Sequence, residues 1–420
     1  MRILWLKTEL LHPVDKGGKI RTYHMLKELK KKHHVTYLTL EDGSAEVDAE
    51  DKSREYAHET ITVSHKTSPK FSPRFYAELV GNLVSNYPYA LQKYVSPEMS
   101  VAIKRQVDGS ETDIAVCDFL APAVNFPLDL KVPTLLFQHN VEAIIWRRHF
   151  ENETNPLKKA FLKTQWRRMF EYEKKTCLRF DRVVAVSQDD AEIIQNDYGA
   201  VNVSSISTGV DTEYFAPTGE IEKDEFNIVF TGSMDWLPNE DAIQWFISDV
   251  LPLIRMHIPN VSLTVVGRNP FRSLVELSRK DQSIIVTGRV QDVRPYMEKS
   301  SVYIVPIRIG GGTRLKIYEA MAMELPIVST TIGAEGLPVK DGKEILLSND
   351  PVGFASAVVK VLQDKDLAVN LGRQAAKSVR EKHGWANVAD DFASNCERAI
   401  GESRQAPRDI QLDTKLLTAV

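Results

Sequence analysis

The sequence has few cysteines and no long apolar run, and both shortages restrict the class of protein. Its three cysteines, Cys117, Cys177 and Cys396, are odd in number and far apart. Such spacing is typical of free thiols in a reducing compartment rather than of a disulfide framework. No stretch approaches the roughly 18 uninterrupted apolar residues that indicate a membrane-spanning helix. We therefore expect a cytoplasmic protein that at most contacts a membrane from outside.

The N-terminus also lacks the features of a secretory signal. Its first ten residues, MRILWLKTEL, have too short an apolar part and reach a charge too soon. With 43% hydrophobic and 26% charged residues, the composition is typical of a globular protein. A chain of 420 residues is long enough for two domains, each with its own core.

An excess of charge of one sign is missing from the chain as a whole. The net charge of −4 gives no indication of a nucleic-acid partner. The distribution is uneven, however, because residues 146–182 hold 11 Lys and Arg against 5 Asp and Glu. Apolar residues at helical spacing predict a basic helix over 157–179. This helix either makes a peripheral membrane contact on an anionic bilayer or packs on the core with a solvated basic exterior.

The beginning of the chain predicts a parallel doubly wound sheet. Residues 2–7 form an expected strand, a loop with Gly17 and Gly18 follows, and a helix from residue 19 leads to a second strand at 34–40. Such sheets bind ligands at the loop after the first strand, so both glycines are candidate binding residues. An ordinary tight turn is the alternative.

A second candidate lies where a later strand ends. Residues 134–137 are an expected buried strand, and His139 follows almost directly. A histidine at the carboxyl end of a strand is placed where open α/β sheets keep their chemistry. A structural, hydrogen-bonded histidine is the alternative.

The stretch from Ser301 to Thr331 contains the residues needed to bind a diphosphate. A short β-branched strand leads to Gly310, Gly311 and Gly312, whose missing Cβ atoms let backbone N–H groups approach a ligand. No Gly-Lys-Ser/Thr follows these glycines, so the stretch is not a Walker A loop.

A helix is expected directly after the three glycines. Thr313 is a natural N-cap, and Arg314 and Lys316 follow in the first turn. Cations are unfavourable at a helix N-terminus by about 0.3–1 kcal/mol, so two of them indicate a bound anion. One turn further on, Glu319 is placed to accept hydrogen bonds from two ribose hydroxyls. A glycine turn with solvated basic side chains is the alternative.

This stretch resembles the donor-site segment of the family 4 glycosyltransferases. The resemblance rests on Pro306, Gly310 to Lys316, Glu319 to Ala322, Pro326 to Val328 and the segment 207–217. It implies the α/β GT-B fold, with two Rossmann-like domains, a central cleft and a C-terminal helix that crosses back to the N-terminal domain. We accordingly expect an acceptor-side domain at 1–206, a nucleotide-sugar-binding domain at 207–385, a return helix at 386–402 and a polar tail at 403–420.

The resemblance also implies roles for individual residues. Glu319 would hold the ribose of the nucleotide-sugar, and His139 would lie beside the sugar and the β-phosphate. Gly17 and Gly18 would face the donor phosphates and the acceptor.

Further donor contacts are implied after two strands of the second domain. Gly232 follows the first of them, and the turn with Arg289 and Val290 would meet the nucleobase through its backbone.

Two positions depart from the family's pattern. Gly311 stands where many members have a glutamate that contacts the transferred sugar. Ser233 and Met234 stand where most members have a phosphate-clamping arginine. We expect Arg314 and Lys316 to supply that charge.

The resulting hypothesis is a retaining glycosyltransferase that moves a sugar from a nucleoside-diphosphate sugar to a glycan or lipid-linked acceptor. His139, Arg314 and Lys316 are its candidate catalytic residues, because fixed cations and donors stabilise a departing diphosphate. We expect no metal ion or other cofactor. Two alternatives remain, an enzyme of this fold that hydrolyses or epimerises a nucleotide-sugar, and a non-catalytic partner protein, which Gly311 favours.

Overall fold

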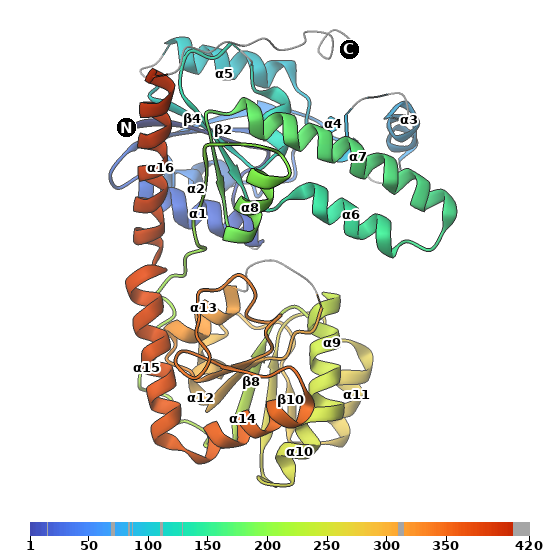
Figure 1. The fold of residues 1–420 in the computed structure, drawn as a ribbon, viewed down its shortest axis with the longest axis vertical. Helices are drawn as coiled ribbons and strands as arrows, with labels where there is room; N and C mark the ends of the chain where they lie inside the picture. Colours follow the sequence, from blue (N-terminus) through green and yellow to red (C-terminus); the bar gives the residue numbers. More distant parts are fainter. Residues whose placement is uncertain are drawn as a thin grey trace. The chain divides into compact units, whose positions relative to one another are not determined.

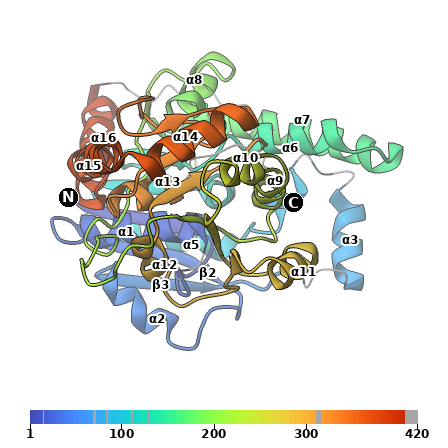
Figure 2. The same cartoon turned by 90° about the horizontal axis from the view of Figure 1, so that it is seen from below.

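The chain folds into two compact α/β units, drawn from two directions in Figures 1 and 2. A computed structural model describes residues 1–14, 16–68, 72–82, 85, 87–109, 112–127, 129–309 and 315–405. The first unit contains Met1–Ser207 and the described residues from Val388 onward, and the second contains Thr208–Asn387. Among these described residues, no helix is long and apolar enough to cross a membrane.

The first unit is built on a parallel sheet whose strands, in the described part of the chain, follow the order β3-β2-β1-β4-β5-β6-β7. Its strands are β1 (Arg2–Lys7), β2 (His34–Glu41), β3 (Glu59–Ser64), β4 (Ile114–Asp118), β5 (Thr134–Gln138), β6 (Arg182–Ala185) and β7 (Val203–Ser205). In the register, Ile3 of β1 lies between Val35 of β2 and Ile114 of β4. Both faces of the central strands are buried, as expected for a parallel sheet.

The helices of this unit are α1 (Gly17–Leu29), α2 (Ala49–Lys52), α3 (Pro73–Gly81), α4 (Tyr89–Gln92), α5 (Pro97–Gly109), α6 (Glu142–Asn152), α7 (Pro156–Arg179), α8 (Gln188–Asn196) and α16 (Trp385–Gln405). Helices cover both faces of the sheet, whereas α3 and α6 lie beside it (Figure 1). Leu4 and Leu136 pack on one face with α5, α7 and α8. Trp5 and Phe137 point to the other face, where both rings contact Phe392 of α16. Neighbouring residues of a strand face opposite sides of the sheet, so this alternation determines which helices pack against each face.

The second unit repeats the architecture with a parallel sheet of order β10-β9-β8-β11-β12-β13 in the described residues. Its strands are β8 (Asn227–Thr231), β9 (Ser262–Val266), β10 (Ile284–Val286), β11 (Val302–Val305), β12 (Ile327–Ser329) and β13 (Leu346–Leu347). Its helices are α9 (Leu237–Trp245), α10 (Leu251–Arg255), α11 (Arg272–Lys280), α12 (Arg294–Lys299), α13 (Leu315–Ala322), α14 (Pro351–Gln363) and α15 (Lys365–Lys382). Ile228 packs with α9, α10 and α14, whereas Val229 packs with α12, α13 and α15. Each unit therefore has three layers, and the predicted two-domain α/β fold is confirmed.

Some elements differ from their prediction or were not predicted. α9 begins at Leu237, and a π-helical turn at Phe246–Val250 separates it from α10. Pro252 has no backbone N–H to continue the hydrogen-bond ladder, and the wider turn accommodates this break. α1 begins at Gly17 rather than at residue 19, so both glycines belong to its first turn. α16 continues to Gln405, into the stretch predicted as tail.

A contact between α15 and the end of α13 yields a test of the packing. A Cβ atom at Gly372 of α15 would lie 2.2 Å from the carbonyl oxygen of Glu324, so the two segments would have to separate. We expect Gly372→Ala to lower the free energy of unfolding by about 1–3 kcal/mol, measured by urea denaturation. In the matched change Gly401→Ala in α16, the Cβ meets nothing within 4 Å, and stability should rise by up to about 1 kcal/mol. Equal losses in both variants would contradict this packing.

Candidate active site

In each sheet the strand order reverses at one pair of neighbouring strands, and the chain continues from these two strands in opposite directions across the sheet. β1 and β4 lie side by side, but the next strand on one side is β2 and on the other β5. β8 and β11 have the same relation to β9 and β12. The carboxyl ends of such strand pairs border the crevice where open α/β sheets bind ligands. Most of the candidate residues that the structure describes lie near these two places.

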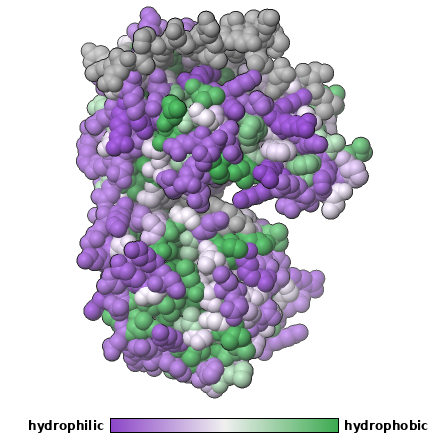
Figure 3. Space-filling model, in the orientation of Figure 1, coloured by the Kyte–Doolittle hydropathy of each residue, from purple (hydrophilic) through white to green (hydrophobic). Residues whose placement is uncertain are grey.

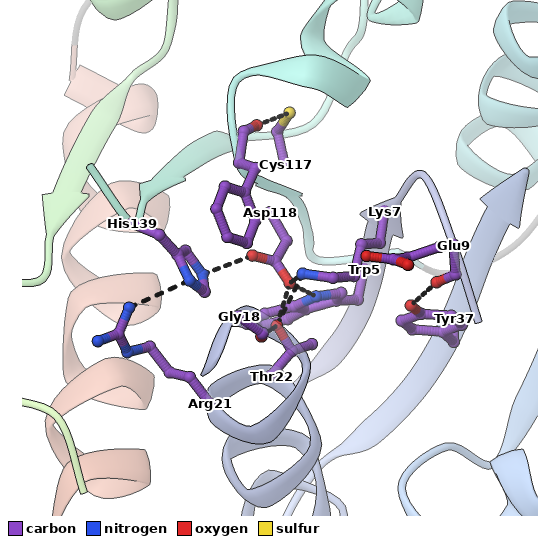
Figure 4. A network of polar contacts seen from close by, with 11 residues as sticks. Trp5, Lys7, Glu9, Gly18, Arg21, Thr22, Tyr37, Cys117, Asp118 and His139 are labelled. Atoms are coloured by element: carbon purple, nitrogen blue, oxygen red, sulfur yellow. Dashed lines mark hydrogen bonds and ion pairs between the residues drawn. The ribbon is translucent and has the colours of Figure 1, made fainter. Parts of the chain in front are cut away.

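A buried polar network occupies this place in the first unit (Figure 4). Its centre is the carboxylate of Asp118, the last residue of β4, which is 0% exposed. Asp118 Oδ2 accepts hydrogen bonds from Lys7 Nζ at 2.8 Å and Thr22 Oγ1 at 2.6 Å. The same oxygen accepts a third hydrogen bond, from Trp5 Nε1 at 3.0 Å. One carboxylate therefore ties β1, α1 and β4 together.

His139 approaches the same carboxylate from β5. Its Nε2 lies 2.7 Å from Asp118 Oδ1, an electrostatic contact rather than a well-aligned hydrogen bond. Its Nδ1 lies 3.2 Å from Arg21 Nη1. A guanidinium only donates, so Nδ1 is the acceptor and the ring proton sits on Nε2, toward Asp118. Phe119 stacks on the imidazole with ring centroids 3.7 Å apart. His139 is thus held on three sides and is only 3% exposed.

Burial is the largest electrostatic influence on this network. It lowers the pKa of His139 to about 3, although Asp118 opposes the shift. Burial alone would raise the pKa of Asp118, but Lys7 and His139 outweigh it, and the pKa lies well below its usual range. Burial also lowers the pKa of Lys7, again opposed by Asp118. At neutral pH, therefore, an ionised Asp118 lies beside a neutral imidazole.

The two glycines at the start of α1 have different surroundings. A Cβ atom at Gly18 would lie 2.8 Å from Cζ of Phe119, whereas one at Gly17 would meet nothing within 4 Å. Phe119 itself has a φ of 73°, a backbone region that non-glycine residues rarely adopt. Gly18 is therefore required for α1 to begin against this ring. Gly17 is exposed in the first turn, where helix N–H groups lack partners within the helix.

A second buried carboxylate fixes the segment that follows His139. Glu173 of α7 is 0% exposed and accepts hydrogen bonds from the backbone N–H groups of Glu142 at 2.9 Å and Ala143 at 2.8 Å. It also accepts from Gln138 Nε2 and from Tyr198 Oη, each at 2.8 Å. Burial raises the pKa of Glu173 to about 7. This carboxylate caps the N-terminus of α6 and fixes its direction away from β5.

In the second unit, the loops after β8 and β9 are in backbone contact. A Cβ atom at Gly267 would lie 1.8 Å from the carbonyl oxygen of Gly232. Asn239 Nδ2 donates to the carbonyl oxygen of Ser233 at 2.8 Å, which closes the loop onto α9. Met234, at the position where the family has a clamping residue, is buried.

Lys316 of α13 reaches back to this loop. Its Nζ donates to Asn239 Oδ1 at 3.0 Å and lies 4.2 Å from the centroid of the Phe230 ring. A Cβ atom at Gly232 would lie 2.8 Å from the same Nζ. The structure thus brings Gly232 and Lys316 together at the carboxyl ends of β8 and β11.

Glu319 lies one turn further along α13 and is half-buried. Burial raises the pKa of its carboxyl group to about 7, and Lys316 opposes the shift. Among the described residues, no side chain or backbone group donates a hydrogen bond to this carboxylate. A half-buried carboxylate in this position is suited to accept hydroxyl hydrogen bonds from a ligand.

The remaining predicted donor residues are partly outside the described chain. The run Gly310, Gly311, Gly312, Thr313 and Arg314 lies outside the described residues, so their roles remain predictions. Arg289 is exposed, and Val290 packs partly on the core below β11. Both residues follow β10, the strand at the edge of the sheet. The contact of their backbone with a nucleobase stays a prediction.

Four members of the network around His139 were not predicted from sequence, namely Trp5, Lys7, Arg21 and Thr22. One signal was available, because Lys7 and Asp118 are opposite charges at the carboxyl ends of buried strands. Such charges are rarely buried unless they are paired. Arg21 and Thr22 carry no such signal, because a helical spacing alone does not say which face meets the sheet edge.

Comparison with solved structures defines the class of fold. The chain superimposes on sucrose-phosphate synthase from Thermosynechococcus elongatus with a TM-score of 0.68 at 17% identity, covering 96% of this chain and 100% of that one. It superimposes on HepE from Anabaena, solved with UDP, with a TM-score of 0.65 at 13% identity, covering 95% and 100%. Two doubly wound units with these similarities define a GT-B fold.

Comparison with protein families gives the particular family. A family model described as Glycosyltransferase Family 4 matches residues 16–214, and one described as Glycosyl transferases group 1 matches residues 225–364. The chain therefore belongs to the family 4 glycosyltransferases.

Two curated relatives are similar over part of their length. An uncharacterised 44.6 kDa protein in the cps region of Klebsiella pneumoniae is 26% identical over 259 residues, or 59% of this chain and 64% of that protein, less than two thirds of its length. The lipopolysaccharide core biosynthesis mannosyltransferase LpcC of Rhizobium leguminosarum bv. viciae is 23% identical over 268 residues, or 59% of this chain and 73% of that protein.

The low pKa of His139 predicts a specific pH dependence of stability. The unfolded chain binds a proton at this histidine below about pH 6.5, whereas the folded chain, with a pKa of about 3, does not. The contribution of His139 is thus present above about pH 6.5 and is lost as the pH falls toward 3. Between about pH 6.5 and pH 3 the unfolding free energy of the wild type should fall as the pH is lowered. We expect His139→Gln to lessen this fall by up to about 1.4 kcal/mol per pH unit, measured by urea unfolding.

Above neutral pH the same pair of proteins provides the control. There the wild type and His139→Gln should differ by a constant amount, because neither form titrates at this position. Parallel curves across the whole range would show that His139 binds its proton equally in both states and would contradict its burial as a neutral group.

Proposed function

We propose that the protein is a retaining glycosyltransferase that moves a sugar from a nucleoside-diphosphate sugar to a glycan or lipid-linked acceptor. The observation that carries the proposal is the pairing of Lys316, which reaches Gly232, with the half-buried Glu319 one turn away. The lysine cation suits a diphosphate, and the carboxylate suits the ribose. The family membership and the Rhizobium mannosyltransferase relative support transfer rather than hydrolysis.

The proposed chemistry relies on stabilising the nucleoside diphosphate as it leaves. Lys316 and, by the family resemblance, Arg314 and the glycines 310–312 compensate the charge that develops on the phosphate oxygens. The leaving phosphate then accepts the proton of the acceptor hydroxyl. The pKa of about 3 at His139 supports this assignment, since so weak a base is ill suited to take that proton at neutral pH. We propose that His139 contacts and orients the donor sugar and does not transfer a proton.

The transfer is proposed to need no bound metal ion. Among the described residues, no three His, Cys, Asp or Glu side chains lie close enough together to hold one. The triplet Asp364-Lys365-Asp366 joins α14 to α15, and the Asp364 carboxylate accepts a hydrogen bond from the backbone N–H of Leu367. The triplet is therefore a connection between helices. Lysine side chains and helix N–H groups take the place of a cation at the diphosphate.

Nucleotide titration tests the donor site directly. We expect one of UDP, GDP, ADP and dTDP to bind the purified protein in calorimetry, with or without chelator. Glu319→Gln should weaken that affinity by about 10-fold or more, because the ribose loses a charged acceptor. Since the pKa of Glu319 is raised to about 7, wild-type affinity should rise from about pH 6 to about pH 8, and the variant should lose this rise.

The control for this experiment is Glu276→Gln, an exposed glutamate on α11 that forms an ion pair with Arg272. It should bind like the wild type. If none of the four nucleotides bound the wild type, the proposed donor site would be wrong and the non-catalytic alternative would be favoured.

We further propose that the protein works at the cytoplasmic face of a membrane, held there by the basic segment 146–182. The buried residues of α7 include Met169, Glu173 and Cys177, so its apolar face is already used for packing. The visible side of this helix pair in Figure 3 is mostly hydrophilic with scattered apolar residues. Attraction of exposed lysines to anionic lipids is therefore the proposed force, without insertion of the helix.

Vesicle sedimentation tests this contact. We expect binding to vesicles containing phosphatidylglycerol, weakened by salt, and no binding to phosphatidylcholine alone. Reversing three exposed lysines, Lys158→Glu, Lys163→Glu and Lys175→Glu, should lower the partition coefficient by at least about 100-fold, because each contributes about 1 kcal/mol. The same reversals at Lys280, Lys343 and Lys377, exposed in the second unit, are the control. Equal losses in both triple variants would argue against a localised contact.

A further inference from the structure

We propose that one face of α6, together with parts of α4 and α7, forms a binding subsite for the sugar rings of the acceptor. This inference rests on the proposed transfer function and adds to it the place and chemistry of acceptor recognition. An open pocket of about 630 Å³ lies here, and its lining includes Glu142, Trp146, His149, Asn152, Glu153 and Leu162. A volume of this order is typical of small-molecule sites.

The lining residues share one face of a single helix. Glu142, Trp146 and His149 are spaced i, i+4 and i+7 along α6, and Glu153 follows at i+11, just after the helix ends. Residues at this spacing project from the same side of an α-helix. The pocket therefore runs along α6 and has room for a chain of rings rather than for one group alone.

The chemistry of this face suits a neutral polyhydroxyl ligand. Trp146 is half-buried and offers an aromatic surface against which the C–H face of a sugar ring can pack. Glu142 and Glu153 provide hydroxyl acceptors, and the side chains of His149 and Asn152 both donate and accept. An apolar face between hydrogen-bonding groups is what a pyranose ring requires.

The charge of the lining argues against an anionic ligand. Residues 146–182 carry 11 Lys and Arg, yet no Lys or Arg is among the described residues that line this pocket. Two carboxylates, those of Glu142 and Glu153, are present there instead. A phosphate or nucleotide would be repelled by this lining, whereas sugar hydroxyls would not.

The face is held rigid at both ends. At the start of α6, the Glu173 carboxylate binds the N–H groups of Glu142 and Ala143. Near its end, Phe150 stacks on Trp166 of α7 with centroids 5.6 Å apart and an interplanar angle of 12°. The Trp146 ring is thereby presented by a fixed helix, which lowers the ordering cost of binding.

The pocket also begins near the buried network of the first unit. α6 starts at Glu142, three residues after His139, at the carboxyl end of β5. Ligands of doubly wound sheets lie outside these carboxyl ends. A saccharide along α6 would thus have one end near His139 and the rest directed outward from the sheet.

Ligand-observed NMR on the full chain tests the subsite. The probes are the methyl glycosides of glucose, galactose, mannose and N-acetylglucosamine, and the disaccharides maltose and cellobiose. We expect at least one to bind, with a disaccharide tighter than its methyl glycoside. Trp146→Ala should weaken binding by about 10-fold, the effect of losing one aromatic contact.

Matched variants separate recognition from folding. Glu142→Gln and Glu153→Gln should each weaken saccharide binding, and they supply the test if Trp146→Ala does not fold. Tyr76→Ala, at an exposed aromatic residue of α3, and Glu151→Gln, at an exposed glutamate of α6 outside the pocket, should bind like the wild type. Unchanged saccharide affinity in all three pocket variants would overturn the proposal, as would the absence of binding by every probe.

Two further outcomes separate a failure of the acceptor subsite from a failure of the proposed transfer function. All pocket variants should bind nucleotide like the wild type. If saccharides bound the pocket but no nucleotide bound the protein, the subsite would stand and the proposed transfer function would fail. If n-octyl glucoside bound and methyl glucoside neither bound nor competed, the pocket would recognise the alkyl chain, and the saccharide proposal would be wrong.

Discussion

The buried carboxylate of Asp118 is the interaction on which the first unit depends. It accepts three hydrogen bonds from β1 and α1 and faces His139 of the next strand. An ionised carboxylate without these partners would cost several kcal/mol in such surroundings, so the four elements must meet in one arrangement. The electrostatic requirement, more than the apolar packing, therefore fixes the geometry of the sheet edge where Gly17 and His139 lie.

The corresponding strand ends of the second unit are organised differently. There the contacts are between backbone and backbone at Gly232 and Gly267, and the charged side chains remain near the surface. Lys316 is bound to Asn239 and also interacts with the Glu319 carboxylate one turn along α13. The first unit therefore holds its sheet edge with a buried ion pair, and the second with backbone contacts and the side chains of one helix.

The fold was largely predictable from sequence because its strands are buried on both faces. The run 2–7 is apolar between its two charged ends, and the structure has a strand with the predicted ends. β7, β12 and β13 have only two or three residues, too few to show a pattern. The apolar spacing continues through the break between α9 and α10, so only Pro252 indicates it in the sequence.

The candidate site was predictable only where one segment contains it. Lys316 and Glu319 belong to a single helix, so their spacing showed that they lie near each other. The surroundings of His139 could not be predicted in this way, because its partners come from residues 21, 118 and 119, far apart in sequence. The resemblance indicated where His139 lies but not that it is buried and neutral.

The membership of α16 in the first unit affects the order in which the chain can fold during synthesis. Phe392 completes the face that Trp5 and Phe137 begin, and Glu402 pairs with the buried Arg182. A ribosome makes all of residues 208–387 before it makes these groups. Part of one apolar face of the N-terminal sheet therefore stays exposed until α16 is made, while the second unit already has every strand it needs. The unit whose synthesis begins first is therefore the unit that completes its folding last.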